Sequence, residues 1–400
     1  MADNTKIEWT DATWNPITGC SVHSPGCTNC YAMQLAGTRL AHVPSRAGLT
    51  QPSKAGPVWT GEVRLNEDAL TQPLRWRRPR MIFVCAHGDL FHENVPDEWI
   101  DRVFAVMALC PQHTFQVLTK RSSRLREYFR ESTGWRARIA GLLNDLKPSP
   151  LWNGNVHQGW QNLHGQPDGL PNVWLGVSVE DQARADQRVP DLLATPAAVR
   201  WLSCEPLLGP VDLRWIAEPD DEKDGVIDAL LGCNWVQSTN IGEEFRPMRP
   251  GHQDRLIRRW VCSPEADILA DRKLDWIVVG GESGPNARPM HPDWARSLRD
   301  QCADAGVPFF FKQHGEWGPD TGPDDDYDRD GYRRDRVMEG AVPVRVLVDG
   351  KWQEFASGYA PPVELCFRPG EWVYRLGKKR NGRLLDGQLH DAMPQIGGVR

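Results

Sequence analysis

The sequence predicts an α/β fold: a partial or complete parallel (β/α) barrel of about six strands, with insertions and a small β-rich C-terminal appendage. Three observations predict it. Short apolar runs rich in β-branched and aromatic residues recur along the chain, helical patterns lie between several of them, and polar residues follow each run directly. Alternating strands and helices are typical of a parallel sheet, whether open or closed into a barrel.

The apolar runs have the near-continuous hydrophobic character of strands that are buried on both faces. In chain order, the predicted strands are MIFVC (81–85), TFQVL (114–118), VWLGV (173–177), VRWLS (199–203), WIVVG (276–280) and VPFFF (307–311). A further segment, TWNPIT (13–18), is interpreted as a first strand or an extended stretch.

Helical patterns are clearest in two connecting segments. In PDEWIDRVFAVMALC (96–110), apolar residues recur at intervals of three and four, which predicts an amphipathic helix. HPDWARSLRDQCADAG (291–306) carries Asp293 in its first turn and ends at Gly306, a typical C-terminal cap. A shorter helix is predicted for YAMQLAGTRLAH (31–42).

The length allows one large domain with insertions, or two domains. We assign residues 1–316 to the barrel, with insertions near 131–171 and 217–272, and residues 317–400 to a small β-rich region. The first insertion is rich in Gly, Asn and Gln, and the second begins with the acidic run AEPDDEKDG. In the C-terminal region, the DG dipeptide of VPVRVLVDGKWQEF (342–355) predicts a hairpin turn.

The composition indicates a cytosolic protein. The chain carries 47 Lys and Arg against 53 Asp and Glu, a net charge of −6. This total charge gives no sign of wholesale nucleic-acid binding, but a mildly acidic chain can still carry a local basic patch. The first residues lack the regions of a signal peptide, and the apolar runs are too short to span a membrane. We therefore expect a cytoplasmic protein with no membrane contact. The 18 Trp are scattered, which favours core and interface positions over base stacking.

Polar side chains follow every predicted strand. In parallel α/β folds the ligand site forms at the carboxyl ends of the strands. The residues at these ends are His87 and Asp89, Thr119 and Lys120, Ser178 and Glu180, Cys204 and Glu205, Glu282, and finally Lys312, Gln313 and His314. One polar strand end is ordinary, but six in succession indicate a single polar cavity.

The stretch WNPITGCSVHSPGCTNCYAMQ (14–34) contains Cys20, His23, Cys27 and Cys30. Ten cysteines are too few for a disulfide scaffold in a chain of this size, and a tight cluster in a reducing compartment is more often a metal site. With His23 included, the four residues could form a closed, structural Zn²⁺ site. Without it, three thiolates could hold an iron–sulfur cluster with one open iron. The loop precedes a predicted helix and caps the edge with the polar strand ends, which favours the cluster.

The motif GC…CTNCYA resembles the cluster loop of radical SAM enzymes, whose three cysteines hold a [4Fe–4S] cluster with S-adenosylmethionine on the open iron. FVCAHGDLF, VLTKRSSRLREYF, WLGVSVED and LSCEPL are similar to successive strand-end motifs of the spore-photoproduct-lyase branch, which repairs DNA. Nearly the whole chain, including GGESGPNARPMHPDW and PFFFKQHGEW, resembles an uncharacterised phage and prophage family with a three-cysteine motif. Here six residues, and not the usual three, separate Cys20 from Cys27, and Asn29 replaces the usual aromatic residue.

The resemblance implies roles for individual residues in cofactor binding. Cys20, Cys27 and Cys30 would bind the cluster as thiolates. Tyr31 would lie against the adenine of S-adenosylmethionine. The residues that would hold its methionine and ribose groups are Asp89, Ser178 and Glu180.

Four further strand-end residues are candidates for catalysis. Cys85 and Cys204 are candidate hydrogen-atom donors because each sits at a strand end, but for either one singly a buried apolar thiol is the favoured interpretation. Glu205 and Lys120 are candidate proton-transfer groups, the alternative being an ion pair that lines the barrel.

Two hypotheses follow. The chain is either a radical SAM-like iron–sulfur enzyme acting on a nucleotide or nucleic acid, or a zinc-stabilised protein that binds nucleic acid or a protein partner without catalysis.

Two basic segments are relevant to the binding partner: LRWRRPRM (74–81) and RLGKKRNGR (375–383). An isolated basic run is usually a solvated charge run, but cations beside aromatic residues suit a phosphate backbone and stacked bases. We expect Lys378, Lys379 and Arg380 to contact phosphates.

Overall fold

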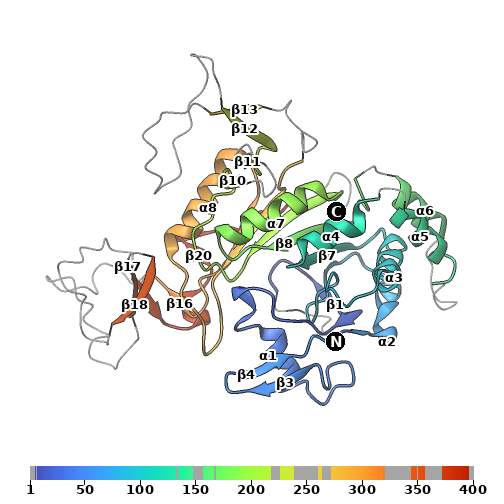
Figure 1. The fold of residues 1–400 in the computed structure, drawn as a ribbon, viewed down its shortest axis with the longest axis horizontal. Helices are drawn as coiled ribbons and strands as arrows, with labels where there is room; N and C mark the ends of the chain where they lie inside the picture. Colours follow the sequence, from blue (N-terminus) through green and yellow to red (C-terminus); the bar gives the residue numbers. More distant parts are fainter. Residues whose placement is uncertain are drawn as a thin grey trace.

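The computed structural model describes residues 5, 7–131, 134–146, 156–165, 168–217, 226–237, 260–263, 272–319, 344–348, 350–355 and 372–395. Seven parallel strands form one open sheet that curves into a half-barrel, in the order β1-β6-β7-β8-β9-β14-β15 (Figure 1). The strands are β1 (Ala12–Trp14), β6 (Met81–Val84), β7 (Thr114–Thr119), β8 (Val173–Ser178), β9 (Val199–Cys204), β14 (Trp276–Gly280) and β15 (Phe309–Gln313). All six predicted strands are confirmed, and the segment at 13–18 contributes to β1. The sheet does not close into a complete barrel.

Helices connect most neighbouring strands of the sheet. They are α3 (Asp97–Ala108) between β6 and β7, α4 (Ser122–Phe129) after β7, α7 (Gln182–Ala194) between β8 and β9, and α8 (Pro292–Ala305) between β14 and β15. The cap of α8, Gly306, has a φ of 66°, a left-handed conformation that glycine adopts without strain. The predicted end of this helix is therefore confirmed.

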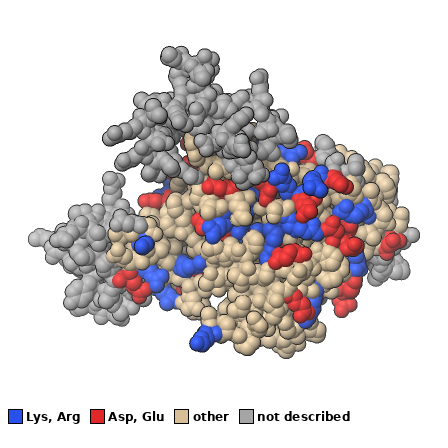
Figure 2. Space-filling view, in the orientation of Figure 1, with Lys and Arg blue, Asp and Glu red and all other residues tan. Residues whose placement is uncertain are grey.

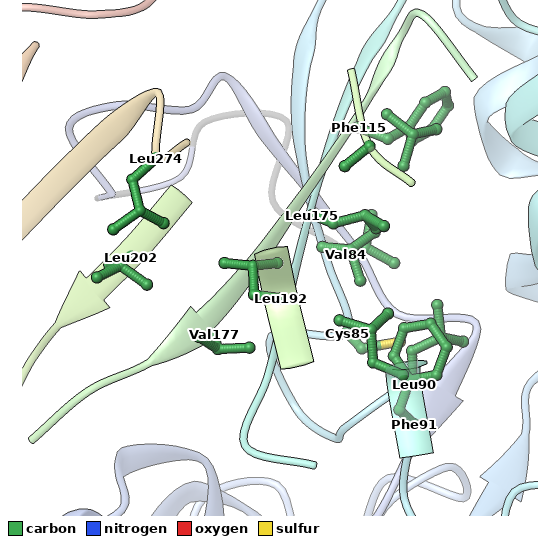
Figure 3. Close-up of a cluster of buried hydrophobic side chains, with 14 of the residues drawn as sticks. Val84, Cys85, Leu90, Phe91, Phe115, Leu175, Val177, Leu192, Leu202 and Leu274 are labelled. Atoms are coloured by element: carbon green, nitrogen blue, oxygen red, sulfur yellow. The ribbon is translucent and has the colours of Figure 1, made fainter. Parts of the chain in front are cut away.

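Side chains alternate between the two faces of the sheet, as the pleat requires. One face packs against the helices, where a large apolar core includes Leu175, Val177 and Leu202 from the strands and Leu192 from α7 (Figure 3). The other face carries an aromatic cluster that includes Trp174, Trp201, Trp276 and Phe310. The alternation decides which strand-end residues can reach a site at the concave face.

Segments from both ends of the chain cover the concave face. Trp9 packs edge-on against Trp201 and Trp276, with ring centroids 5.2 and 5.7 Å apart, and its carbonyl oxygen accepts a hydrogen bond from Gln116. The indole nitrogen of Trp276 donates to the carbonyl oxygen of Ala392 at 2.9 Å. These tryptophans are core residues, as their scattered distribution predicted, and they fill the half-barrel from within.

The two insertions have secondary structure of their own. The first contains α5 (Gly134–Leu142) and α6 (Val156–His164), which pack against α3. The second forms an antiparallel sheet of β10 (Ile216–Ala217), β11 (Val226–Asp228), β12 (Cys233–Gln237) and β13 (Trp260–Ser263). Most of the acidic run that opens it, residues 218–225, lies outside the described residues.

The C-terminal region is β-rich, as predicted. Its antiparallel sheet consists of β16 (Trp317–Gly318), β17 (Val344–Val348), β18 (Lys351–Phe355) and β19 (Trp372–Arg375). β17 and β18 pair as the hairpin that the DG dipeptide predicted. The chain continues into α9 (Lys378–Asn381) and the hairpin of β20 (Leu384–Leu385) and β21 (Gln388–Leu389).

Small elements surround the N-terminal part of the sheet. They are β2 (Ile17–Thr18), η1 (Pro25–Cys27), α1 (Tyr31–Gly37), β3 (Thr50–Ser53), β4 (Gly56–Trp59), β5 (Arg64–Leu65), α2 (Glu67–Leu70) and η2 (Gln72–Arg75). α1 and the β3–β4 hairpin share a small apolar core. Among the described residues, no helix is long and apolar enough to cross a membrane.

Candidate functional site

Residues 19–30, here called the cysteine loop, begin at the carboxyl end of the parallel sheet. The amide of Gly19 donates to the carbonyl oxygen of His87 at 3.1 Å, and Gly19 forms an isolated parallel bridge with Gly88, just beyond β6. A Cβ on Gly88 would come within 3.0 Å of the Gly19 carbonyl oxygen, so the close approach favours glycine at this position. The loop therefore starts at the edge where the polar strand ends meet.

Arg121 anchors the first part of the cysteine loop. Its guanidinium donates to Sγ of Cys20 at 3.4 Å and to the carbonyl oxygen of Ser21 at 3.1 Å. It also pairs with Asp89 at 3.1 Å and with Glu93 at 3.2 Å. Because Arg121 and Asp89 are both buried, the ion pair fixes the cysteine loop to the ends of β6 and β7.

The carboxylate of Asp89 is hydrogen-bonded by other groups of the protein. Its carboxylate accepts hydrogen bonds from the Thr119 hydroxyl at 2.7 Å, from the Lys120 amide at 3.1 Å and from the Phe91 amide at 3.0 Å, in addition to Arg121. These partners occupy most of the acceptor positions of a carboxylate. In this structure, the residue implied as a cofactor contact holds the strand ends together.

A second buried ion pair anchors the middle of the cysteine loop. Arg188 of α7 donates to Oε2 of Glu180 at 2.8 Å, and these side chains are 1% and 0% exposed. The hydroxyl of Ser24 donates to the other carboxylate oxygen, and Nζ of Lys120 lies 3.8 Å from it. A Cβ on Gly26 would come within 2.3 Å of Oε1 of Glu180. The loop thus lies directly on a fixed, buried carboxylate.

The pKa of Glu180 is lowered from its usual value. Burial alone would raise it, but the positive charges of Lys120 and Arg188 and the hydrogen bond from Ser24 outweigh burial. A carboxyl group with a depressed folded pKa stabilises the fold above its unfolded pKa, about 4.3 for Glu. This contribution is lost as the pH falls through the folded pKa.

We therefore expect the free energy of unfolding to fall as the pH is lowered from about 5 into the region below 4.3. Glu180→Gln should be less stable at neutral pH because it leaves Arg188 buried without its carboxylate, and its stability should fall less steeply in acid. Urea unfolding at a series of pH values from neutral to acid measures both slopes. Equal slopes for the two proteins would contradict the assignment.

A third group anchors the end of the cysteine loop to the segment between β14 and α8. Arg288 donates to the Glu282 carboxylate at 2.6 and 2.8 Å and to the carbonyl oxygen of Pro25 at 2.9 Å. The side-chain amide of Asn29 donates to Glu282 at 3.0 Å and to the carbonyl oxygen of Asn286 at 2.8 Å. The position where the resemblance leads one to expect an aromatic residue is therefore an anchor in this chain.

The loop's three cysteines are free thiols, whereas Cys233, in the second insertion, is disulfide-bonded. Burial raises the pKa of Cys20 to about 12; Arg121 lowers it, and Asp89, Cys27 and Cys30 raise it further. The three thiols therefore lie close enough to interact electrostatically. Across the part of the chain that the structure describes, no three Cys, His, Asp or Glu side chains form a group that could hold a metal ion.

His23, the fourth ligand of the zinc hypothesis, has an exposed side chain. Its pKa is lowered from the usual value, first by partial desolvation and then by the positive charges of Arg121 and Arg188. His23 therefore lies in the field of the two arginines that anchor the cysteine loop.

Tyr31 directly follows the cysteine loop and is the first residue of α1. Its side chain is 55% exposed, whereas its hydroxyl donates a 2.7 Å hydrogen bond to the carbonyl oxygen of Ala86. Burial among the surrounding protein atoms raises the pKa of this hydroxyl well above its usual value, and Cys30 and Glu205 raise it further. Tyr31 therefore presents an exposed ring beside the cysteine loop while its hydroxyl is fixed to the segment after β6.

Glu205 and Lys312 form an ion pair at two further strand ends. Nζ of Lys312 donates to both carboxylate oxygens of Glu205, at 2.9 and 2.8 Å, and Gln313 donates to one of them at 3.2 Å. The two side chains retain 21% and 14% exposure, so a ligand can reach them. The expected pair of Glu205 with Lys120 does not form, because Lys120 lies against Glu180.

A family model described as a protein of unknown function (DUF5131) matches residues 4–394. The chain belongs to this family. No curated protein and no solved structure matches it. The family match includes the cysteine loop and every anchor of this DUF5131 chain, but its description states no activity.

Two candidate hydrogen-atom donors of this DUF5131 chain are buried apolar thiols, the alternative that the sequence favoured for either one singly. Cys204 is fully buried in the core between sheet and helices, because it follows Leu202 by two positions and the pleat places both on that face. Cys85 has a φ of 56°, which ends the alternation, and its side chain joins the same core (Figure 3). Burial raises the pKa of Cys85 to about 12. Ser178 lies on the opposite face, two positions after Gly176, and is also buried.

The arginine anchors of this DUF5131 chain were not predicted. Arg121 directly follows the strand end Thr119–Lys120, so its position in the sequence could have marked it as a candidate site residue. Arg188 lies inside a helix and Arg288 lies in a connection, and nothing in their local sequence distinguishes them from solvated charges. Their partners become apparent only when the chain is folded.

Proposed function

We propose that the cysteine loop holds a [4Fe–4S] cluster through Cys20, Cys27 and Cys30, and that the chain is a radical SAM-type enzyme acting on a nucleotide or nucleic acid. The observation that carries the proposal is the position of three free thiols in one loop, anchored by buried ion pairs at the carboxyl edge of a parallel half-barrel. That edge is where such folds bind their ligands.

Three thiols are the donor type that a cluster requires, whereas their placement among the described residues forms no group around a single ion such as Zn²⁺. Thiolates are the ligands of iron–sulfur centres, and positive charge nearby favours the thiolate over the thiol. Burial raises the pKa of Cys20, whereas Arg121, which donates a hydrogen bond to its Sγ, lowers that pKa and would stabilise the thiolate once it is bound to iron. When bound and reduced by an external donor, such a cluster supplies an open iron for S-adenosylmethionine and an electron for its cleavage.

The accessible residues beside the loop would serve the ligands. The Tyr31 ring offers a flat apolar surface, fixed by its hydroxyl, against which an adenine can lie. Lys312 and Glu205 would offer a substrate a cation and a carboxylate, which two hydrogen bonds hold side by side. Asp89 and Glu180 would act indirectly, because their carboxylates orient the arginines that hold the cysteine loop.

Binding of S-adenosylmethionine tests the proposal. Equilibrium dialysis compares anaerobic protein reconstituted with iron and sulfide against the same protein without metal. We expect about one bound molecule per chain in the reconstituted protein and almost none in the metal-free protein, because the open iron supplies the main contact. Equal binding to both forms, or binding to neither, would contradict the proposal.

Replacing His23 by Ala separates the cluster from the zinc alternative. With three thiolate ligands, the variant is expected to retain nearly all of its iron. If zinc were held by Cys₃His, the variant should lose roughly tenfold or more in metal affinity, since one of four ligands would be missing. Metal analysis and a competitive chelator titration of the variant and wild type decide between them.

A further inference from the structure

A cavity of about 540 Å³ lies in the C-terminal region near β16 and α9. Its lining consists of Glu316, Leu376, Gly377, Lys378, Lys379 and Arg380. The three consecutive cations are exposed. Within the described part of the chain, no carboxylate forms an ion pair with any of them, while Glu316 accepts a hydrogen bond from the amide of Gly284 at 3.2 Å. Among the described residues that line the cavity, three cations are present with one carboxylate, Glu316.

The connection between β14 and α8 links the cavity to the cysteine loop. Arg375, just before the cavity, donates to the carbonyl oxygen of Pro285. The next residue, Asn286, accepts a hydrogen bond from Asn29, which lies beside Cys30 in the cysteine loop. Two adjacent residues, Pro285 and Asn286, thus contact Arg375 beside the cavity and Asn29 in the cysteine loop. A ligand in the cavity would lie at the same edge of the sheet as Tyr31.

Other positive charges are arranged differently. Over α4 and α7, Figure 2 shows Lys and Arg interspersed with Asp and Glu, and Arg126 and Arg184 there pair with Asp191 and Asp181. The basic segment with Arg75, Arg77 and Arg78 immediately precedes β6, so it lies at the amino edge of the sheet, away from the cysteine loop. Only one of the two predicted basic segments is therefore next to the candidate site.

We propose that the cavity binds backbone phosphates of a nucleic-acid strand and directs that strand toward the cysteine loop. This inference rests on the proposed function, because the strand would be the substrate of the candidate site. The cavity is an open depression of the surface, through which a strand can pass, and three adjacent exposed cations suit several phosphates of one backbone. A positively charged groove that tracks the backbone is how proteins bind a strand without reading its sequence.

The test compares two triple variants with the same loss of charge. Lys378→Gln/Lys379→Gln/Arg380→Gln removes the cavity cations, and Arg75→Gln/Arg77→Gln/Arg78→Gln removes three cations at the opposite edge. Labelled single- and double-stranded oligonucleotides are titrated at several salt concentrations. We expect the cavity variant to bind at least tenfold more weakly and its salt slope to flatten by about 2 to 3 units, near one per lost phosphate contact. The control should bind like the wild type.

Several results would overturn the inference. One is the absence of oligonucleotide binding at low salt, and another is an equal loss of oligonucleotide affinity in the two variants. A third is that the wild type binds a mononucleotide as tightly as the oligonucleotide. A fourth is that it binds polyglutamate as tightly, which would identify a general surface for acidic proteins. Iron content is measured on the same samples. Lost strand binding with full iron content in the cavity variant supports the inference, and absence of iron from the wild type contradicts the proposed function independently.

Discussion

Replacing Cys27 by Ala is expected to abolish stoichiometric metal binding. Cys27 is the most buried of the three thiols of the cysteine loop, and no fourth cysteine lies in that loop to replace it. A cluster held by two thiolates would lose a third of its protein ligands and should not survive purification. Iron and sulfide analysis after anaerobic reconstitution measures the loss, with a content below about a tenth of wild type expected.

The fold of this variant should persist. Arg121 and Arg288 donate to the carbonyl oxygens of Ser21 and Pro25, and Glu180 accepts a hydrogen bond from Ser24, so these anchors do not depend on the Cys27 thiol. The loop has few apolar residues of its own, so these anchors are what we expect to keep the domain from loosening when the ligand is lost. Cys302→Ala, which removes a buried thiol in α8, is the control and should retain full iron content. Full iron content in the Cys27 variant would contradict the ligand assignment.

Replacing Arg188 by Met is expected to cost about 3 to 5 kcal/mol of folding free energy, because it leaves the Glu180 carboxylate buried without its main partner. Arg184→Met, four positions earlier on α7, removes an ion pair with Asp181 that is about a quarter exposed. That change should cost no more than about 1 kcal/mol. Urea unfolding of the three proteins measures the difference.

The Arg188 variant should also lose metal affinity. Glu180 accepts a hydrogen bond from the hydroxyl of Ser24, so displacement of this carboxylate would release the middle of the cysteine loop. Iron content should therefore fall in Arg188→Met and remain unchanged in Arg184→Met. Equal destabilisation by the two substitutions would show that the buried pair does not anchor the loop.

Several features could be predicted from the sequence because they depend on local patterns. Buried parallel strands give continuous apolar runs, so β6, β7, β8, β9, β14 and β15 were identified within a few residues. The position of Cys20 at the carboxyl edge followed from the order of strand, loop and helix. Gly306 ended α8 for a local conformational reason.

Other features depend on contacts between distant parts of the chain. The pairing of Arg188 with Glu180 requires α7 to fold back on β8, and the contact of Arg288 with Pro25 joins segments from opposite ends of the barrel sequence. The filling of the concave face by Trp9 likewise requires a terminal segment to dock there. The orientation of Cys204 could be predicted from strand alternation with Leu202, and it agrees with the buried apolar thiol that the sequence favoured.

The metal content of the purified protein tests the central claim most directly. The chain is purified anaerobically, and iron, acid-labile sulfide and zinc are determined per chain together with the visible absorbance. We predict a brown protein with a broad visible band and about four iron and four sulfide per chain, as a [4Fe–4S] cluster requires. A colourless protein with about one zinc per chain, lost on replacing His23, would contradict the account and identify a structural zinc site.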